Sequence, residues 1–71
     1  MKYILKIKGT EKIPDFVQIR DDKMTLIAYF RLSQIEAGLK KNGLISEIEG
    51  ISNLLKLIPY GKIHKYLSKD E

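Results

Sequence analysis

The chain contains no cysteine and no tryptophan, and its 71 residues include only one histidine and two prolines. Without cysteine there is no disulfide framework, no cysteine-based zinc site and no thiol nucleophile. We expect residues 1–71 to form one small domain, because a typical domain has roughly 100–200 residues. An enzyme built on a barrel or a doubly wound sheet needs upwards of about 200 residues and is excluded by length.

Long apolar runs are missing as well. The longest uninterrupted one, Leu26 to Phe30, is far shorter than the ~20 residues that span a bilayer. Lys6 and Lys8 interrupt the apolar start of the chain before the roughly 7–15 apolar residues that a signal peptide requires. These two absences predict a cytoplasmic protein with no membrane partner.

The composition is that of a folded domain with a moderate basic excess. Hydrophobic residues make up 44% of the chain and charged residues 31%, which is the globular range and not that of disorder. The net charge of +4 favours acidic partners such as nucleic acid. However, eleven of the thirteen basic residues are lysine, and they accompany eleven isoleucines. Because both residues have A/T-rich codons, coding bias would produce this excess without any ligand, and it is favoured over a binding patch as the explanation.

Alternation of apolar and polar side chains predicts strands in the first half of the chain. In residues 1–8, Tyr3, Leu5 and Ile7 alternate with lysines. This pattern predicts a half-buried strand whose outer face carries Lys2, Lys6 and Lys8, with Ile4 as an exception on that face. A loop over Thr10–Asp15 follows, because Pro14 cannot donate to a sheet ladder.

Residues 16–20 and 23–32 are predicted to form a hairpin, since Asp21 and Asp22 suit a turn. A turn at these residues predicts a register in which Arg20 pairs with Lys23 and Ile19 with Met24. One face of the hairpin then carries Val17, Ile19, Met24, Leu26, Ala28, Phe30 and Leu32. The opposite face carries Phe16, Gln18, Arg20, Lys23, Thr25, Ile27, Tyr29 and Arg31.

From Ser33 onward the apolar spacing becomes helical. Ser33 and Glu36 have the spacing of a capping box, which predicts a helix over residues 34–42 that ends at Asn42-Gly43. Ser46 and Glu49 repeat this spacing, and a second helix is expected to bury one stripe and to end at Pro59. The stripe consists of Ile48, Ile51, Leu55 and Ile58. A last strand over residues 62–67 precedes a charged tail.

The predicted fold class is therefore α+β, with the element order β-β-β-α-α-β. Two helices with one apolar stripe each, and a sheet with one apolar face, can cover each other only by stacking. We expect a two-layer domain in which an antiparallel sheet of about four strands packs on two helices.

The residues do not predict a catalytic site, a metal site or a cofactor. His64 is the only histidine, and Asp21-Asp22 lacks the spaced oxygen ligands of a calcium loop. No serine lies in a strand–serine–helix elbow, and the five glycines do not have a phosphate-binding spacing. Lys56 lies in an apolar context but is expected on the solvent side of its helix. We therefore expect a protein that is not an enzyme.

One surface is a candidate for function, namely the outer face of the predicted sheet. Its candidate interaction residues are Phe16, Arg20, Lys23, Ile27, Tyr29 and Arg31. Such an apolar face suits burial in a symmetric homo-oligomer or against another protein. Basic residues interleaved with aromatic ones also suit single-stranded nucleic acid. The prediction is a protein-interaction or self-associating module, with nucleic-acid binding as the alternative.

Three segments of the chain resemble a family of short, uncharacterised bacterial proteins of about this length. The segments are VQIRDDKMTLIAYFRL, EAGLKKNGL and LIPYGKIHK. Some members of that family carry the name fructose-6-phosphate aldolase, which would imply a Schiff-base lysine in a (β/α)₈ barrel. This chain is too short for such a barrel, and no motif allows a residue to be carried over. Aldolase activity therefore stays a distant alternative.

Overall fold

The regular elements follow one another in the predicted order. The computed structural model describes residues 1–67, so the predicted charged tail, residues 68–71, lies outside the described part. The strands and helices are β1 (Lys2–Ile7), β2 (Phe16–Arg20), β3 (Leu26–Arg31), α1 (Ile35–Lys41), α2 (Ile48–Leu57) and β4 (Ile63–Tyr66). A short 3₁₀ turn precedes each helix, and these turns are η1 (Leu32–Gln34) and η2 (Ile45–Glu47).

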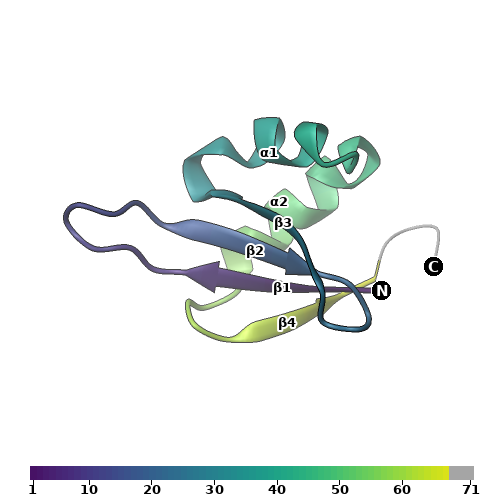
Figure 1. Cartoon of the computed structure of the whole chain (residues 1–71), viewed down its shortest axis with the longest axis horizontal. Coiled ribbons are helices and arrows are strands. Elements are labelled where there is room, and N and C mark those ends of the chain that lie inside the picture. The colour runs from purple at the N-terminus through teal and green to yellow at the C-terminus, as the bar shows by residue number, and fades with distance from the viewer. Residues whose placement is uncertain (68–71) are drawn as a thin grey trace.

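The four strands form one sheet in the order β3-β2-β1-β4, and all neighbouring strands are antiparallel. β1 is a central strand, in which Ile4 lies opposite Ile19 of β2 and opposite His64 of β4. Both helices lie on the same side of the sheet, so they leave its other face open (Figure 1). The two-layer α+β fold predicted from the sequence is confirmed.

The hydrophobic core fills the space between the sheet and the helices. Its buried members are Ile4, Val17, Ile19, Ala28, Phe30, Leu39, Ile51, Leu55 and Ile58. Two glycines allow the layers to approach closely, because a Cβ on Gly38 would overlap the Phe30 ring and one on Gly50 would overlap the Tyr66 hydroxyl.

The turn between β2 and β3 is longer than predicted, and the predicted register is wrong. Ile19 pairs with Ala28 and not with Met24, and a bulge lies where Arg20 pairs with Leu26. One Asp21 carboxylate oxygen accepts hydrogen bonds from the backbone N–H groups of Lys23 and Thr25, both at 2.9 Å. The Met24 N–H donates to the Asp21 carbonyl, and Met24 has a φ of 67°. From Phe16 to Ile19 the register moves by an even number of residues, so the residues from Ala28 to Arg31 keep their predicted faces. Leu26 and Met24, predicted on the core face, do not: the bulge places Leu26 opposite Arg20 with an exposed fraction of 44%, and Met24 lies in the turn, 41% exposed.

Both predicted capping boxes are absent. Gln34 and Glu47 are the N-cap residues, and neither makes a side-chain capping hydrogen bond. Ser33 and Ser46 lie instead inside the 3₁₀ turns η1 and η2, whose tighter hydrogen bonding satisfies backbone groups at the start of each helix.

Glu47 is instead tied to the sheet. It is buried, and its Oε2 accepts a hydrogen bond of 2.7 Å from the Tyr66 hydroxyl of β4. Burial and this hydrogen bond raise the pKa of Tyr66 to about 12. The start of α2 is therefore fixed to β4 by a contact that the sequence did not predict.

α2 ends as predicted, since its last helical residue is Leu57 and Ile58 is extended before Pro59. The predicted apolar stripe of α2 is confirmed, with Ile51, Leu55 and Ile58 buried and Ile48 packed against the core. No helix within residues 1–67 combines the length and the apolar character that crossing a membrane requires.

β1 presents the opposite face to the helices from the one predicted. Ile4 and Lys6 lie on the helix side, with exposed fractions of 0% and 9%, whereas Leu5 and Ile7 lie on the open side. The physical reason is that the Lys6 ammonium reaches the C-terminal end of α2. It donates hydrogen bonds to the carbonyls of Leu55 (2.8 Å) and Ile58 (3.2 Å). These orphan carbonyls and the helix dipole favour a cation, so they offset the cost of burying the ammonium.

The turn after α2 extends this contact to the loop between β1 and β2. The Lys6 Nζ lies 4.5 Å from the centroid of the Tyr60 ring, and the Tyr60 hydroxyl donates to Asp15 at 2.8 Å. The Gly9 N–H donates to the other carboxylate oxygen of Asp15 at 2.6 Å. The Gly9 and Tyr60 hydrogen bonds, with the nearby lysines, hold the pKa of Asp15 below its usual value, and the bond to Asp15 raises the pKa of Tyr60.

Replacing Lys6 tests the importance of this contact. We expect Lys6→Met to lower the free energy of unfolding by about 1–3 kcal/mol, because it leaves the Leu55 and Ile58 carbonyls without their donor. Urea denaturation gives this difference. Lys12→Met is the control, since Lys12 is exposed in the loop and its replacement should cost less than about 0.5 kcal/mol. Equal unfolding midpoints for the two variants would contradict the role of Lys6.

Candidate functional site

The open face of the sheet is the candidate site. Strand pairing places its side chains in three rows that cross the sheet from β3 to β4. The first row has Arg20, Tyr3 and Lys65; the second has Tyr29, Gln18, Leu5 and Ile63; the third has Arg31, Phe16 and Ile7. Neither α1 nor α2 covers this face (Figure 1).

Five of the six predicted interaction residues lie on or beside this face. Phe16, Arg20, Tyr29 and Arg31 belong to its rows, and Ile27 lies in the bulge opposite Arg20. Lys23 lies outside the paired strands, in the hairpin turn, where its N–H donates to the Asp21 carboxylate. The structure therefore gathers most of the predicted set on one surface, and it places Lys23 at the end of that surface.

The sequence prediction missed the contribution of β1 and β4. Tyr3, Leu5 and Ile7 of β1 were expected on the core side, and Ile63 and Lys65 of β4 were not assigned to either face. Ile63 is 48% exposed, while the three β1 side chains are half-buried. Ile4 was the available signal, because it breaks the predicted basic face of β1. The open face is therefore more apolar than the sequence indicated.

The open face also carries fewer basic side chains than predicted. Lys6 is buried on the helix side, and Lys8 lies beyond the end of β1 with its Nζ 5.9 Å from the Tyr60 ring. The cations that lie on the open face are Arg20, Arg31 and Lys65. The strands β1 to β4 contain no Asp or Glu, so these cations have no acidic neighbour on their strands.

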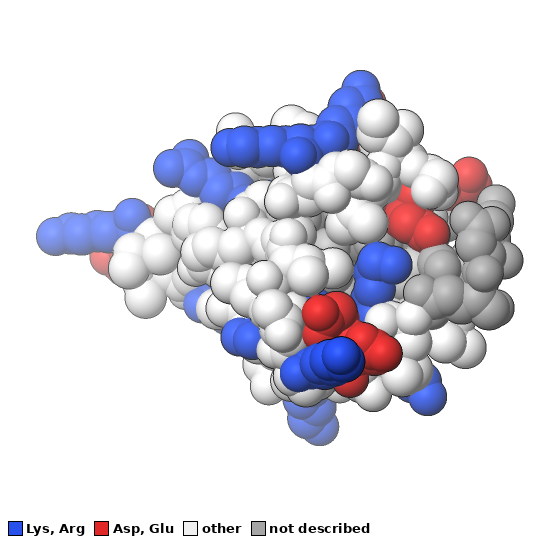
Figure 2. Space-filling view, turned by 45° about the vertical axis from the view of Figure 1, so that its right-hand side comes forward, with Lys and Arg blue, Asp and Glu red and all other residues white. Residues whose placement is uncertain are grey.

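Elsewhere the basic side chains are dispersed. Figure 2 shows the Lys and Arg side chains of one view of the molecule, scattered and separated by uncharged surface, with Asp and Glu among them. In the view of Figure 2 the basic side chains that produce the net charge of +4 do not form one patch. This distribution is compatible with coding bias as the origin of the lysine excess.

Two aromatic rings form an ordered contact on the open face. Phe16 and Tyr29 stack with their ring centroids 4.7 Å apart and an interplanar angle of 14°. They occupy diagonal positions on β2 and β3, which is within reach for aromatic side chains. Arg20 is also held in place, because its guanidinium donates to the Met24 carbonyl and to the Gln18 side-chain oxygen, each at 3.0 Å.

The described residues do not provide a metal centre. Within residues 1–67 there is no group of three His, Asp or Glu side chains that could hold a metal ion. His64 lies on the helix side opposite Ile4, and its Nε2 is buried without a hydrogen-bond partner among these residues. Lys56 is exposed on α2, as the amphipathic pattern predicts.

No family model matches this chain, and neither does any curated protein or solved structure. The resemblance to short bacterial proteins therefore stays a prediction.

The stacked pair can be tested by a double-mutant cycle. We expect Phe16→Leu and Tyr29→Leu to show a coupling of about 0.5–1.5 kcal/mol in urea unfolding, because the stacking is lost once when either ring is removed. A control cycle of Phe16→Leu with Tyr3→Leu should be additive within about 0.5 kcal/mol, since Tyr3 lies in the first row of the face and Phe16 in the third. Additivity in both cycles would show that the rings do not interact in solution.

Proposed function

We propose that this chain is a non-enzymatic interaction module that binds a second copy of itself through the open face of its sheet. The observation that carries the proposal is the composition of β1 and β2, the two central strands. Their outward side chains include Tyr3, Leu5, Ile7 and Phe16, so apolar surface lies at the middle of the face. Removal of such a surface from water is the main driving force of protein association.

The size of the face supports the same proposal. A stable interface buries about 800 Å² on each partner, which is roughly one sixth of the 4931 Å² accessible surface of this chain. One whole face of a two-layer domain is of that order. Two copies related by a two-fold axis would bury the same residues on each side, as in most homodimers.

The positions of the cations are compatible with a dimer. Arg31 and Lys65 belong to the edge strands β3 and β4, so they lie at the rim, where charges remain hydrated. Arg20 is the cation on a central strand, and its guanidinium is already bonded to Met24 and Gln18. Two of the three cations on the open face, Arg31 and Lys65, are therefore kept near the periphery of the interface.

The test replaces an apolar side chain at the middle of the face by a charged one. We expect Leu5→Lys to weaken self-association at least tenfold, because the dimer would have to bury two ammonium groups. Light scattering and sedimentation over a range of concentrations measure the change. Leu57→Lys is the matched control, since Leu57 is 82% exposed on α2 and far from the open face in the fold.

The proposal fails if the unmodified chain is a monomer of 8.2 kDa at about 0.5 mM. It also fails if Leu57→Lys weakens association as much as Leu5→Lys does. Circular dichroism of both variants shows whether each remains folded, and Leu5→Arg provides a second variant at the same position.

Single-stranded nucleic acid is the second candidate partner. The observations that favour it are the stacked rings of Phe16 and Tyr29 and the three cations of a face whose strands carry no carboxylate. Aromatic rings stack on bases, and cations bind the phosphates between them. This alternative has fewer lysines to support it than the sequence predicted, because Lys6 is buried on the helix side.

Salt dependence distinguishes this candidate from self-association. If Arg20, Arg31 and Lys65 each neutralise one phosphate, the logarithm of the binding constant should fall with the logarithm of salt concentration with a slope of about −2. Fluorescence anisotropy of a labelled oligothymidine gives the slope. Lys65→Gln should reduce its magnitude, whereas Lys56→Gln on α2 should leave it unchanged. Absence of binding at low salt would exclude the nucleic-acid candidate.

A further inference from the structure

β3 is an edge strand with backbone groups available for a further strand. Its neighbour in the sheet is β2, and the Leu32 N–H that follows β3 donates to the Asp15 carbonyl at 2.9 Å. In an antiparallel ladder, successive residues point their N–H and C=O groups alternately toward the partner strand and away from it. The pairing therefore directs the backbone groups of Ala28 and Phe30 toward β2, and those of Tyr29 and Arg31 toward the free edge.

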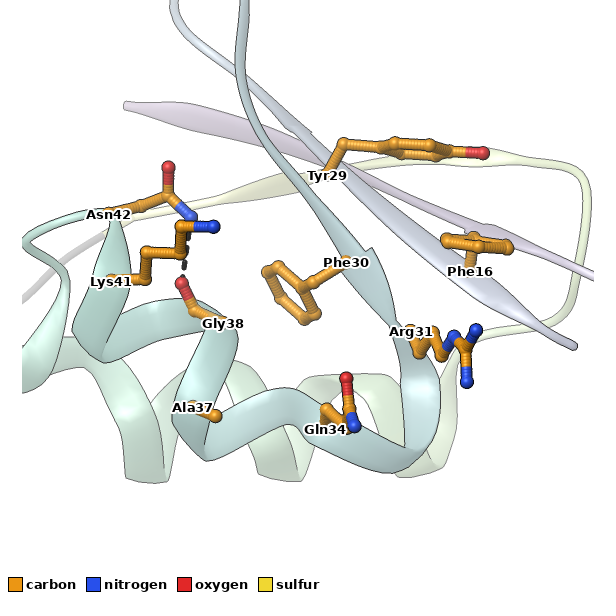
Figure 3. Close-up of a pocket in the computed structure, with 9 residues that line it drawn as sticks. All are labelled: Phe16, Tyr29, Phe30, Arg31, Gln34, Ala37, Gly38, Lys41 and Asn42. Atoms are coloured by element: carbon orange, nitrogen blue, oxygen red, sulfur yellow. Dashed lines mark hydrogen bonds between the residues drawn. The ribbon is translucent and has the colours of Figure 1, made fainter.

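A groove runs along this free edge between β3 and α1. Its volume is about 270 Å³, and its floor is formed by Phe30 of β3 with Ala37 and Gly38 of α1. Figure 3 shows Phe30 projecting toward α1, while Phe16 and Tyr29 lie on the other side of β3. The groove therefore continues past the strand edge from the helix side to the open face.

The charge of the groove is positive. Figure 3 shows Arg31 and Gln34 at one end and Lys41 and Asn42 at the other. None of the residues that line the groove is Asp or Glu. Glu36 of α1 lies outside this lining and forms an ion pair of 3.0 Å with Lys40. A segment that occupies the groove would thus meet a cation near each end.

β3 also lacks two of the features that protect edge strands from further pairing, and its bulge lies at the Leu26 end, before Tyr29 and Arg31. It has no proline, and its inward-facing residues Ala28 and Phe30 are apolar. Its six residues present a longer edge than the four residues of β4. Tyr29, whose backbone faces the free edge, is 52% exposed.

We propose that the β3 edge binds an extended peptide segment with an acidic residue near each end, which adds to the sheet as a further strand. The Tyr29 and Arg31 N–H and C=O groups bond the guest backbone, as in other cases of strand addition. The side chains of the guest alternate between the Phe30–Gly38 groove and the Tyr29 ring. Its carboxylates lie near Arg31 and Lys41. This site shares Phe16, Tyr29 and Arg31 with the open face, but it does not include Leu5 and Ile7 at the centre of that face.

The test uses a seven-residue blocked peptide of alternating valine and threonine with a glutamate at each end. The same peptide with lysine at each end is the control. In nitrogen-15 correlation spectra we expect the acidic peptide to shift the amides of Tyr29 and Arg31 and to slow their hydrogen exchange. The amides of Ala28 and Phe30 should keep their exchange rates, because they already bond to β2. Binding of both peptides with equal affinity would overturn the proposed charge preference.

Charge reversal separates the groove from the rest of the surface. Lys41→Glu and Arg31→Glu should each weaken binding of the acidic peptide at least threefold and strengthen that of the lysine peptide. Lys56→Glu is the matched control, and it and Leu5→Lys should change neither affinity, so failure of the self-association proposal leaves this one intact. Shifts centred on Leu5 and Ile63 instead would overturn it. So would slow exchange of the Tyr29 and Arg31 amides without peptide, since a second copy would then occupy the edge.

Discussion

The interaction on which the surface of this protein depends is the contact between the Lys6 ammonium and the last carbonyls of α2. β1 is a central strand of the sheet. Because the Lys6 ammonium bonds to the end of α2, the side of β1 that carries Lys6 is the side covered by the helices. Because side chains alternate along a strand, the position of Lys6 also fixes the faces of the other β1 side chains. Ile4 enters the core, while Tyr3, Leu5 and Ile7 lie on the open face. One buried cation thus determines which side chains of β1 form the open face.

The architecture could be predicted because it depends on local and periodic features. Period-two alternation, helical spacing, the turn at Asp21 and the stop at Pro59 each determine an element from a few neighbouring residues. The register of the hairpin was wrong, but between Phe16 and Ile19 the error was an even number of residues and therefore did not exchange the faces there. Beyond the bulge, Leu26 left the core face on which it was predicted. The capping boxes failed because the 3₁₀ turns η1 and η2 precede the helices.

The candidate site was predictable only in the part contributed by the hairpin. Phe16, Arg20, Tyr29 and Arg31 could be assigned because β2 and β3 have one clearly apolar face. In β1 the uniformly apolar face, with Tyr3, Leu5 and Ile7, is the open one, and the buried face combines Ile4 with Lys6. The choice of face is made by the carbonyls of Leu55 and Ile58, which are 49 and 52 residues away in sequence. Sequence periodicity contains no information about a contact of that range, so the outer face was expected to be more basic than it is.

The central position of β1 also has a consequence for how the chain folds. A short loop separates β1 from β2, whereas the other neighbour of β1, the strand β4, begins at Ile63 and places Tyr66 opposite Lys2. Contacts of such long sequence separation slow folding, because a long loop must close before they form. Until β4 docks, one edge of β1 remains unpaired. A partly folded chain in which β4 has not yet docked therefore exposes a strand edge on which another chain could pair.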